Sequence, residues 1–297
     1  MSDASVDMDV NPAKRDAVNV DAELDVAFDA RATVGPERFA RLMERYRAES
    51  VQAVTDLPGV TGLVYDAPSG ERLDVWGPGS EEAPRPVFVF VHGGYWRALS
   101  RADSAFAARM LAERGVATVV PDYTLAPRAT LEEITRQVRA TIAWVYHEGA
   151  RYGLDRSRLV VGGSSAGGHL AAMTMVDGWQ AEVGLPENVV AAGFPISGLF
   201  DVRPLVRTRA NEWLRFDEER AAALSPLVLG ARPRMPGVTV MARHEASGFT
   251  EQSRAFAAHW GTELLVVPER NHFDVVLDLA DPETAMSRAL LGLFDRL

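Results

Sequence analysis

Residues 159–170 read LVVGGSSAGGHL, and the order of residue types in this stretch decides the fold. A short apolar run is followed by a G-x-S-x-G pattern centred on Ser165, and then by the apolar beginning of a helical pattern. Glycines on both sides of a serine allow a strained turn between a strand and a helix, because larger side chains would collide there. The stretch therefore predicts a buried strand, an exposed nucleophile at Ser165 and a helix that follows directly.

The rest of the chain alternates between strand and helix patterns. Continuous apolar runs, typical of strands covered on both faces, occur at residues 87–91, 116–120, 159–162, 189–194, 238–241 and 264–267. Helical patterns occur at about 36–54, 101–114, 130–149, 165–176, 249–260 and 282–296. Short β-like pieces at 62–65 and 73–76, separated by Pro-Ser-Gly, predict an antiparallel hairpin. The order predicts an α/β fold with a mainly parallel central sheet, an N-terminal antiparallel hairpin and helices on both faces.

The domain organisation follows from the same patterns. Residues 1–30 hold eight acidic residues against Lys14 and Arg15 and lack sustained periodicity, which predicts an acidic, mobile leader with a short ordered segment near Val26–Phe28 as an option. Residues 31–297 are predicted to form one domain. Lid elements are expected at 36–55 and at 198–230, where the connection is longer than a simple crossover needs.

Composition excludes several kinds of chemistry. The 297 residues include no cysteine, which removes disulfides, thiolate metal sites and cysteine nucleophiles, and Lys14 is the single lysine. The net charge is -10 and no basic segment stands out, so nucleic acid is not an expected partner. No apolar stretch is long enough to span a membrane and no secretory signal is apparent, so we expect a cytoplasmic protein without membrane contact.

A second glycine pair follows the strand at 87–91, in the sequence HGGYW at 92–96. Backbone amides at glycines can approach an oxygen closely, so Gly93 and Gly94, together with the amide of Ala166, are predicted to form an oxyanion hole. A histidine in the first position of such a loop more often fixes the loop by hydrogen bonding. We therefore assign His92 a structural role.

Among the six histidines, His272 is the predicted general base. It follows the last apolar run by a short loop, at the carboxyl edge of the sheet where ligands meet such folds. His147 and His259 fall within helical patterns, and His169 lies one turn into the helix after the serine, where it points away from the front of the serine. His244 directly precedes a candidate acid.

A carboxylate is needed to hold the imidazole tautomer and to stabilise its charged form. Glu245 follows the strand at 238–241 at the same edge. It gives the chain order serine, acid, histidine, which is the order found where a G-x-S-x-G serine lies between a strand and a helix of a parallel sheet. Asp201, after the preceding strand, is the alternative. Asp274 is too close in sequence to His272 to be preferred.

Four segments taken together, HGGYW at 92–96, DYTLAP at 122–127, GGSSAGGHL at 162–170 and NHFDV at 271–275, resemble the α/β-hydrolase superfamily. More narrowly, the Tyr-Trp pair after HGG and the SGLFD, RxxNEW and SPL segments are similar to the kynurenine formamidase (arylformamidase) group, which is related to hormone-sensitive-lipase-type esterases. The resemblance implies a serine hydrolase without a cofactor that converts N-formyl-L-kynurenine to L-kynurenine and formate through a formyl-enzyme, in tryptophan catabolism. The chain departs from the group in having Glu245 where aspartate is common, and ARHE in place of a glycine-containing loop.

An aryl amide or ester suits an aromatic pocket, and aromatic residues occur in the loops expected to ring the site. The predicted substrate-binding residues are Tyr95, Trp96, Phe200 and Trp213. For each of them, packing in the core or lid is an equal alternative. Candidates to meet a substrate carboxylate, or simply to form a solvated basic face, are Arg203, Arg207 and Arg209.

Three other functions remain open at this stage. A carboxylesterase for short-chain or aryl esters needs the same residues and differs only in the shape of the pocket. A non-catalytic ligand-binding protein on a hydrolase scaffold commonly lacks a triad residue, whereas all three are present here. A zinc hydrolase is disfavoured because no HExxH pattern occurs, and no metal site is predicted. The expected partner is a small-molecule amide or ester; a homodimer is compatible with the sequence, but no feature supports it.

Overall fold

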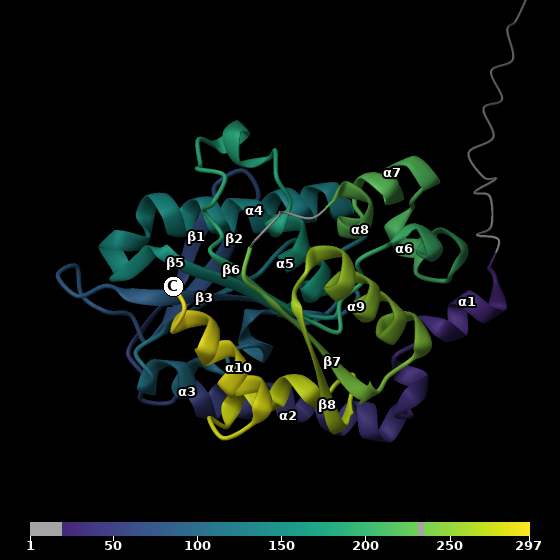
Figure 1. The fold of residues 1–297 in the computed structure, drawn as a ribbon, viewed down its shortest axis with the longest axis horizontal. Coiled ribbons are helices and arrows are strands. Elements are labelled where there is room, and N and C mark those ends of the chain that lie inside the picture. Colours follow the sequence, from purple (N-terminus) through teal and green to yellow (C-terminus); the bar gives the residue numbers. More distant parts are fainter. Residues whose placement is uncertain (1–19, 231–234) are drawn as a thin grey trace, which may run out of the picture.

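The computed structural model of the protein describes residues 20–230 and 235–297, so residues 1–19 of the predicted leader lie outside the described residues. Eight strands form one sheet in the order β1-β2-β4-β3-β5-β6-β7-β8 (Figure 1). β1 (Gly59–Asp66) and β2 (Glu71–Trp76) pair antiparallel as the predicted hairpin. The mutually parallel strands are β3 (Arg85–Val91), β4 (Ala117–Pro121), β5 (Leu154–Ser164), β6 (Ala192–Ile196), β7 (Val238–His244) and β8 (Glu263–Asn271). The predicted fold class is confirmed.

Both faces of the sheet are covered, which explains why its strands are continuously apolar. Along β3, Val87 and Val89 belong to one core cluster, whereas Phe88 and Phe90 belong to another. The helices that cover the first face are α4 (Leu131–Glu148), α5 (Ala166–Met175) and α9 (Ser247–Trp260), and those that cover the second are α2 (Pro36–Val54), α3 (Ala108–Glu113) and α10 (Ala285–Phe294) (Figure 1). The carboxyl ends of the parallel strands meet at one edge between these layers.

Short helical turns fill the remaining connections. The interval after β6 holds α6 (Asn211–Leu214), α7 (Glu218–Ala223), α8 (Pro226–Leu229) and the 3-10 helix η5 (Arg203–Arg207). The other 3-10 helices are η1 (Arg31–Thr33), η2 (Arg101–Asp103), η3 (Gly149–Tyr152), η4 (Gln180–Val183) and η6 (Val275–Ala280). The helix predicted at 101–114 is therefore divided into η2 and α3. The strand predicted at 189–194 begins at Ala192, where pairing with β5 starts.

Residues 20–30, at the end of the predicted leader, pack on the core of the domain. They include α1 (Ala22–Ala27) and the buried Phe28, whose ring centroid lies 6.1 Å from that of Phe249 in α9. The backbone N–H of Asp21 donates to the carbonyl of Arg207, 2.8 Å away. This part of the chain is thus held against η5 and α9.

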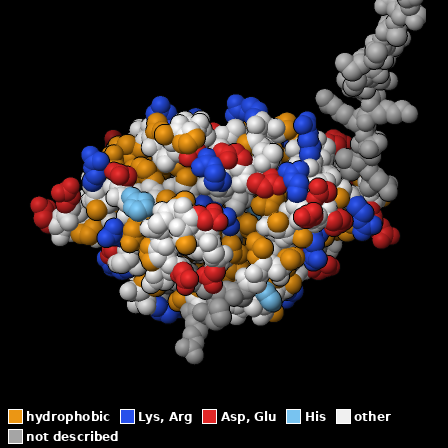
Figure 2. All heavy atoms as spheres, turned by 90° about the horizontal axis from the view of Figure 1, so that it is seen from above, with side chains coloured by type: hydrophobic (Ala, Val, Ile, Leu, Met, Phe, Trp, Pro, Cys, Tyr) orange, Lys and Arg blue, Asp and Glu red, His pale blue; other side chains and the backbone are white. Residues whose placement is uncertain are grey.

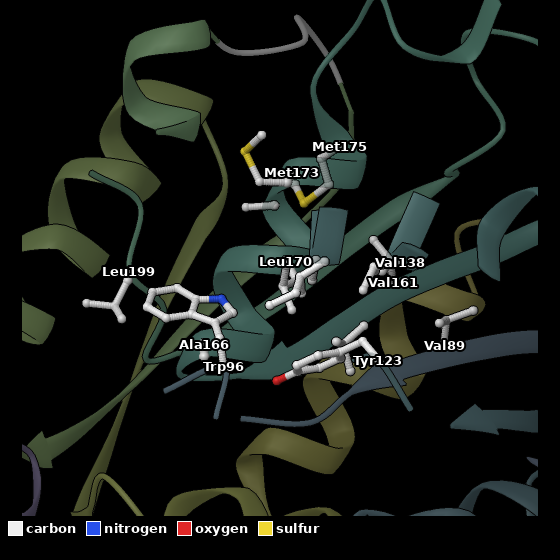
Figure 3. Packing of buried hydrophobic residues seen from close by; sticks show 14 of the residues in the cluster. Val89, Trp96, Tyr123, Val138, Val161, Ala166, Leu170, Met173, Met175 and Leu199 are labelled. Carbon is white, nitrogen blue, oxygen red and sulfur yellow. The ribbon is translucent and has the colours of Figure 1, made fainter. Parts of the chain in front are cut away.

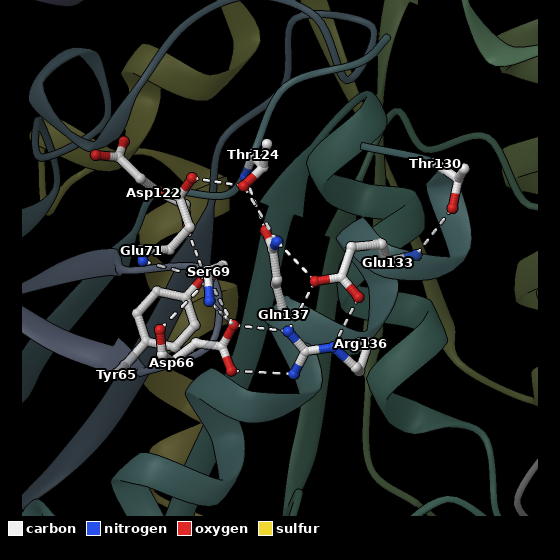
Figure 4. Close-up of polar contacts among 10 residues, drawn as sticks. All are labelled: Tyr65, Asp66, Ser69, Glu71, Asp122, Thr124, Thr130, Glu133, Arg136 and Gln137. Atoms are coloured by element: carbon white, nitrogen blue, oxygen red, sulfur yellow. Dashed lines mark hydrogen bonds and ion pairs between the residues drawn. The ribbon is translucent and has the colours of Figure 1, made fainter. Parts of the chain in front are cut away.

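A polar network holds the loop that follows β4 (Figure 4). The backbone N–H of Thr124 donates to the Gln137 side chain of α4 at 2.8 Å, and the Thr124 hydroxyl donates to Glu71 of β2 at 2.7 Å. The Tyr65 hydroxyl of β1 donates to the carbonyl of Asp122 at 2.6 Å. The loop is therefore tied to a helix and to the hairpin, which gives Tyr123 a defined position beside the glycine loop.

The surface carries charges of both signs. Figure 2 shows arginine side chains and acidic side chains interspersed over one face. None of the described helices is both long and apolar enough to cross a bilayer. On the face that is shown, positive charge is not gathered into one area.

Candidate active site

Ser165 occupies a sharp turn between β5 and α5. Its backbone has φ 59° and ψ -119°, outside the regions that residues with a Cβ favour. The Ser165 N–H donates to the carbonyl of Ile196 at 2.8 Å, and the Ser165 carbonyl accepts from the N–H of His169 at 3.0 Å. These bonds to the neighbouring strand and helix hold the strained turn, so the serine lies at the carboxyl edge of the sheet.

Close backbone packing explains the glycine after the serine. A Cβ added to Gly167 would lie 2.0 Å from the carbonyl oxygen of Val91, at the end of β3. α5 can therefore approach β3 only with glycine at this position. The first turn of α5 points its amides at the region in front of Ser165, where the helix dipole favours negative charge.

His272 and Glu245 come together from the ends of β8 and β7. His272 Nδ1 lies 3.4 Å from Oε2 of Glu245, and both side chains are almost completely buried. The Glu245 Oε1 accepts hydrogen bonds from the Ala242 N–H at 2.7 Å and from the Ser197 hydroxyl. These donors replace the water that a buried carboxylate loses. In this arrangement Nδ1–H donates to Glu245, which leaves Nε2 as the acceptor.

The two alternative carboxylates have other partners. Asp201 forms an ion pair with Arg203 at 2.7 Å. Burial alone would raise the pKa of Asp201, but the hydrogen bonds and charge of Arg203 hold it below its ordinary value. Asp274 accepts from the N–H of Asn271 at 2.6 Å and pairs with an arginine of α2 at 3.1 Å. Asp274 thus fixes the turn that carries the histidine, and the described contacts of His272 with a carboxylate are those with Glu245.

The glycine loop after β3 is shaped by close contacts. Gly94 has φ 93°, and a Cβ there would lie 2.2 Å from the carbonyl oxygen of Ala98. The Tyr123 hydroxyl lies 3.1 Å from the carbonyl oxygens of both His92 and Gly93. Among the described residues, neither the Gly93 N–H nor the Gly94 N–H donates a hydrogen bond to a backbone carbonyl. These contacts fix the shape of the loop, and the two amides predicted for the oxyanion hole have no backbone acceptor in the described chain.

The other histidines occupy positions unlike that of a general base. His92 is buried, stacks on Tyr123 with ring centroids 4.1 Å apart, and has a pKa lowered by burial. His169 lies on the core side of α5, where Nε2 is 2.8 Å from the carbonyl oxygen of Leu224, and burial lowers its pKa to about 4. The exposed histidines are His147, His244 and His259.

A cavity of about 570 Å³ brings the predicted residues together. Ser165, His272, Gly93 and Gly94 all line it, whereas Glu245 and the Ala166 side chain lie behind its wall. The aromatic residues of the wall are Phe28, Phe39, Tyr46, Phe90, Tyr95, Phe106, Trp213 and Phe273. Helix α2 and the segment after β6, both predicted as lid elements, contribute residues to this wall.

Two of the predicted substrate-binding residues are in the core instead. Trp96 is fully buried in the core cluster drawn in Figure 3, and its ring centroid lies 5.2 Å from that of His169 in α5. Phe200 is also fully buried and stacks on Phe256 of α9, with ring centroids 4.0 Å apart. Neither lines the cavity, so the prediction of substrate contact is corrected for these two residues. Tyr95 and Trp213 do line it.

Sequence reasoning missed several contributors to the site. Ser197 lies directly after β6, at the edge shared with the triad candidates, and this position is the signal that could have identified it. Phe28 falls in the predicted leader, where a short ordered segment is an option, but the apolar residues there are too few to indicate that it lines the cavity. Arg31 and Arg97 line the cavity but lie in irregular segments without a recognisable pattern.

The zinc alternative gains no support from the described part of the chain. Over residues 20–230 and 235–297, no three histidine, aspartate or glutamate side chains come close enough together to hold a metal ion.

The comparison with known proteins agrees with the fold. A family model described as BD-FAE matches residues 73–193. The chain is 30% identical over 243 residues to a kynurenine formamidase of Salmo salar, and the aligned residues cover 78% of this chain and 81% of that protein. It is also 30% identical over 261 residues to a kynurenine formamidase of Danio rerio, with 84% and 85% covered.

A solved structure extends the likeness to three dimensions. A protein from Silicibacter sp. tm1040, described as a candidate thioesterase, superposes with a TM-score of 0.77 at 30% identity and covers 91% of this chain and 99% of that one. Identity at this level over most of both chains exceeds what a shared fold alone requires. The chain therefore belongs to the kynurenine formamidase family, within the α/β-hydrolases, and is an enzyme of the serine hydrolase type.

Proposed function

We propose that this enzyme hydrolyses an aryl formamide, N-formyl-L-kynurenine, to L-kynurenine and formate, with Ser165 as nucleophile, His272 as general base and acid, and Glu245 as the residue that orients His272. The observation that carries the proposal is that Ser165 and His272 line one cavity while Nδ1 of His272 faces the buried Glu245. The relatives from Salmo salar and Danio rerio that are named kynurenine formamidase support this choice of substrate.

In the first half of the reaction, Ser165 Oγ attacks the formyl carbon while its proton passes to Nε2 of His272. The carbonyl oxygen becomes an oxyanion that the amides of Gly93, Gly94 and Ala166 stabilise. As the C–N bond breaks, His272 returns the proton to the arylamine nitrogen. Kynurenine leaves, and the formyl group remains as an ester of Ser165.

Water completes the reaction through the same groups. His272 takes a proton from a water molecule, and the hydroxide adds to the formyl ester. When the tetrahedral intermediate collapses, the C–O bond to Ser165 breaks, Ser165 recovers its proton from His272 and formate leaves. No cofactor is needed, because every proton transfer uses His272.

The aromatic wall supports an aryl substrate. Tyr95 and Trp213 pack edge to face, with ring centroids 5.8 Å apart, and the Trp213 Nε1–H donates to the Tyr95 carbonyl at 3.1 Å. Rigid aromatic surfaces of this kind suit a flat ring. With N-formyl-L-kynurenine as substrate the enzyme acts in tryptophan catabolism. The cytoplasmic location and the homodimer stay predictions.

A substrate panel tests the proposal. N-formyl-L-kynurenine, formanilide and a p-nitrophenyl ester are compared for the enzyme, for Ser165→Ala and, as the control, for Ser164→Ala. We expect Ser165→Ala to lower kcat/KM on the formamides by at least about 10³-fold and a fluorophosphonate probe to label Ser165 in the folded enzyme. A preference for the ester by several decades would replace the formamidase with a carboxylesterase, and an unlabelled Ser165 would favour a binding protein.

A further inference from the structure

The charged side chains around the cavity differ in whether they already have partners. Arg203 pairs with Asp201, Arg207 pairs with Asp21 at 3.2 Å, and Arg209 pairs with Asp25 at 3.2 Å. The arginines that the sequence offered for a substrate carboxylate are therefore neutralised by the chain itself. Arg203 and Arg207 do not line the cavity.

Two other guanidinium groups line the cavity without an acidic partner. Among the described residues, no carboxylate lies within ion-pair distance of Arg31 or Arg97. Arg97 lies over the ring of Trp213, 3.8 Å from its centroid, and Arg31 lies over Phe39 at 4.4 Å. Stacking occupies one face of the planar group and leaves its N–H edge free to bind a carboxylate through two parallel hydrogen bonds.

Arg97, unlike Arg31, is bonded to the glycine loop after β3. Its backbone N–H donates to the carbonyl of Gly94 at 3.1 Å, in the same turn that presents the predicted oxyanion amides. The ring on which it stacks is bonded to Tyr95 of this turn. The guanidinium is therefore held in place relative to the scissile bond before the substrate binds. Because little side-chain entropy is lost when the substrate carboxylate contacts Arg97, the contact contributes more to affinity.

The cavity also carries acids. Asp29 and Glu212 line it and form no ion pair in the described chain. Asp29 does accept a hydrogen bond from the Ala32 N–H at 3.1 Å, but no arginine of the described chain neutralises either acid. Charges of both signs without an ion-pair partner, beside an aromatic wall, fit a ligand that is itself a zwitterion better than a simple anion or a neutral ester.

We infer that Arg97 is a specificity-determining residue that binds the α-carboxylate of an amino-acid head group on the aryl substrate, with Trp213 as its platform. The inference rests on the proposed function for the identity of that substrate. It predicts discrimination between two aryl formamides that differ only in the head group.

The test compares kcat/KM on N-formyl-L-kynurenine with that on 2-formamidoacetophenone, a neutral analogue with the same formamide. We expect Arg97→Gln to lower kcat/KM by about 10- to 100-fold for the first substrate, mainly through KM, and by less than about threefold for the second. Arg97→Lys should restore part of the loss, because it keeps the charge but not the paired hydrogen bonds. Arg203→Gln, which removes a paired arginine outside the cavity, is the control.

Two results would overturn the inference. An equal loss of kcat/KM on both substrates would assign Arg97 a structural role through Trp213. A selective loss of kcat/KM in Arg31→Gln but not in Arg97→Gln would assign the head group to Arg31. A second pair, 3-(2-acetoxyphenyl)propionate and its methyl ester, measures the same preference without a formamide. If the formamides are inert but Arg97→Gln selectively slows the carboxylate ester, the proposed function fails and the role of Arg97 stands. If the formamides react without dependence on Arg97, the inference alone fails.

Discussion

The hydroxyl of Ser197 donates a hydrogen bond to Oε1 of Glu245, the carboxylate whose other oxygen faces His272. Ser197 itself has a positive φ of 48° and is fully buried, and its N–H donates to the carbonyl of Val240 in β7 at 2.8 Å. The serine therefore links the ends of β6 and β7 at the point where the predicted acid must keep one orientation. We propose that Ser197 positions Glu245, the predicted acid.

Removal of this hydroxyl should affect turnover more than binding. Ser197→Ala leaves Glu245 with the Ala242 N–H as its remaining donor to Oε1. We expect kcat to fall by about tenfold with KM little changed, because a hydrogen bond to a charged acceptor is lost. Ser253→Ala is the control, since the Ser253 hydroxyl is buried without a partner in the described chain. Steady-state kinetics at one pH measure both; an unchanged kcat in Ser197→Ala would remove Ser197 from the positioning of the acid.

The identity of the acid can be decided by two amide variants. In Glu245→Gln the side-chain NH₂ can donate to His272 Nδ1 and so favour the tautomer with the proton on Nε2, which cannot act as a base. We expect kcat to fall by about 10³- to 10⁴-fold. Asp201→Asn should stay within about threefold of the parent, because Asp201 pairs with Arg203. The reverse ranking of the two variants would make Asp201 the acid.

His169 should make the folded state sensitive to acid. Its pKa is lowered by burial to about 4 in the folded protein, whereas the unfolded chain has the ordinary value of 6.5. Above pH 6.5 the side chain is neutral in both states; below it, the unfolded state takes up a proton that the folded state does not. The free energy of unfolding should thus fall from pH 6.5 towards pH 4, by about 1.4 kcal/mol per pH unit from this group.

Urea unfolding at several pH values between 4.5 and 7.5 measures this effect. His169→Gln keeps a donor for the Leu224 carbonyl but cannot titrate. The free energy of unfolding of the variant should therefore fall less steeply as the pH is lowered, and the difference in slope should correspond to the uptake of one proton on unfolding. Parallel curves for the parent and the variant would show that His169 does not account for the acid sensitivity.

Gly292 offers a stabilising substitution away from the site. It lies inside α10, and an added Cβ would meet no atom within 4 Å. Because alanine has less backbone freedom in the unfolded chain, Gly292→Ala should raise the free energy of unfolding by about 0.5–1 kcal/mol. Thermal unfolding checks this, with Gly167→Ala as the opposite case, since its Cβ would clash with β3. A lower melting temperature for Gly292→Ala would contradict the prediction.

Much of the fold was predictable because its signals are local. Each parallel strand is buried on both faces, so its burial appears as an uninterrupted apolar run. The triad candidates were predictable for a related reason: Ser165, Glu245 and His272 each follow such a run, and parallel strands bring their carboxyl ends to one edge. The G-x-S-x-G pattern around Ser165 added a second signal, since its second glycine, Gly167, is required by the close approach of α5 to β3.

The side chains in irregular segments were not predictable in the same way. Tyr95 and Trp96 are neighbouring aromatics in one loop, and both have positive φ, 53° and 58°. That backbone sends Tyr95 into the cavity and Trp96 into the core, a difference that residue type alone does not reveal. Phe28 likewise depends on contact with Phe249, more than two hundred residues later in the chain, which no local pattern reports.

The wall that contains Phe28 and Arg31 comes from the first described residues, whereas His272 follows the last strand. Ribosomal synthesis produces these parts at opposite times, so a nascent chain that ends before the loop after β8 lacks the predicted base. When the denatured protein is diluted into buffer, recovery of enzyme activity should therefore lag behind the burial of core tryptophans such as Trp96. The reason is that contacts between residues far apart in the sequence, such as those that join the first described residues to the loop after β8, form most slowly.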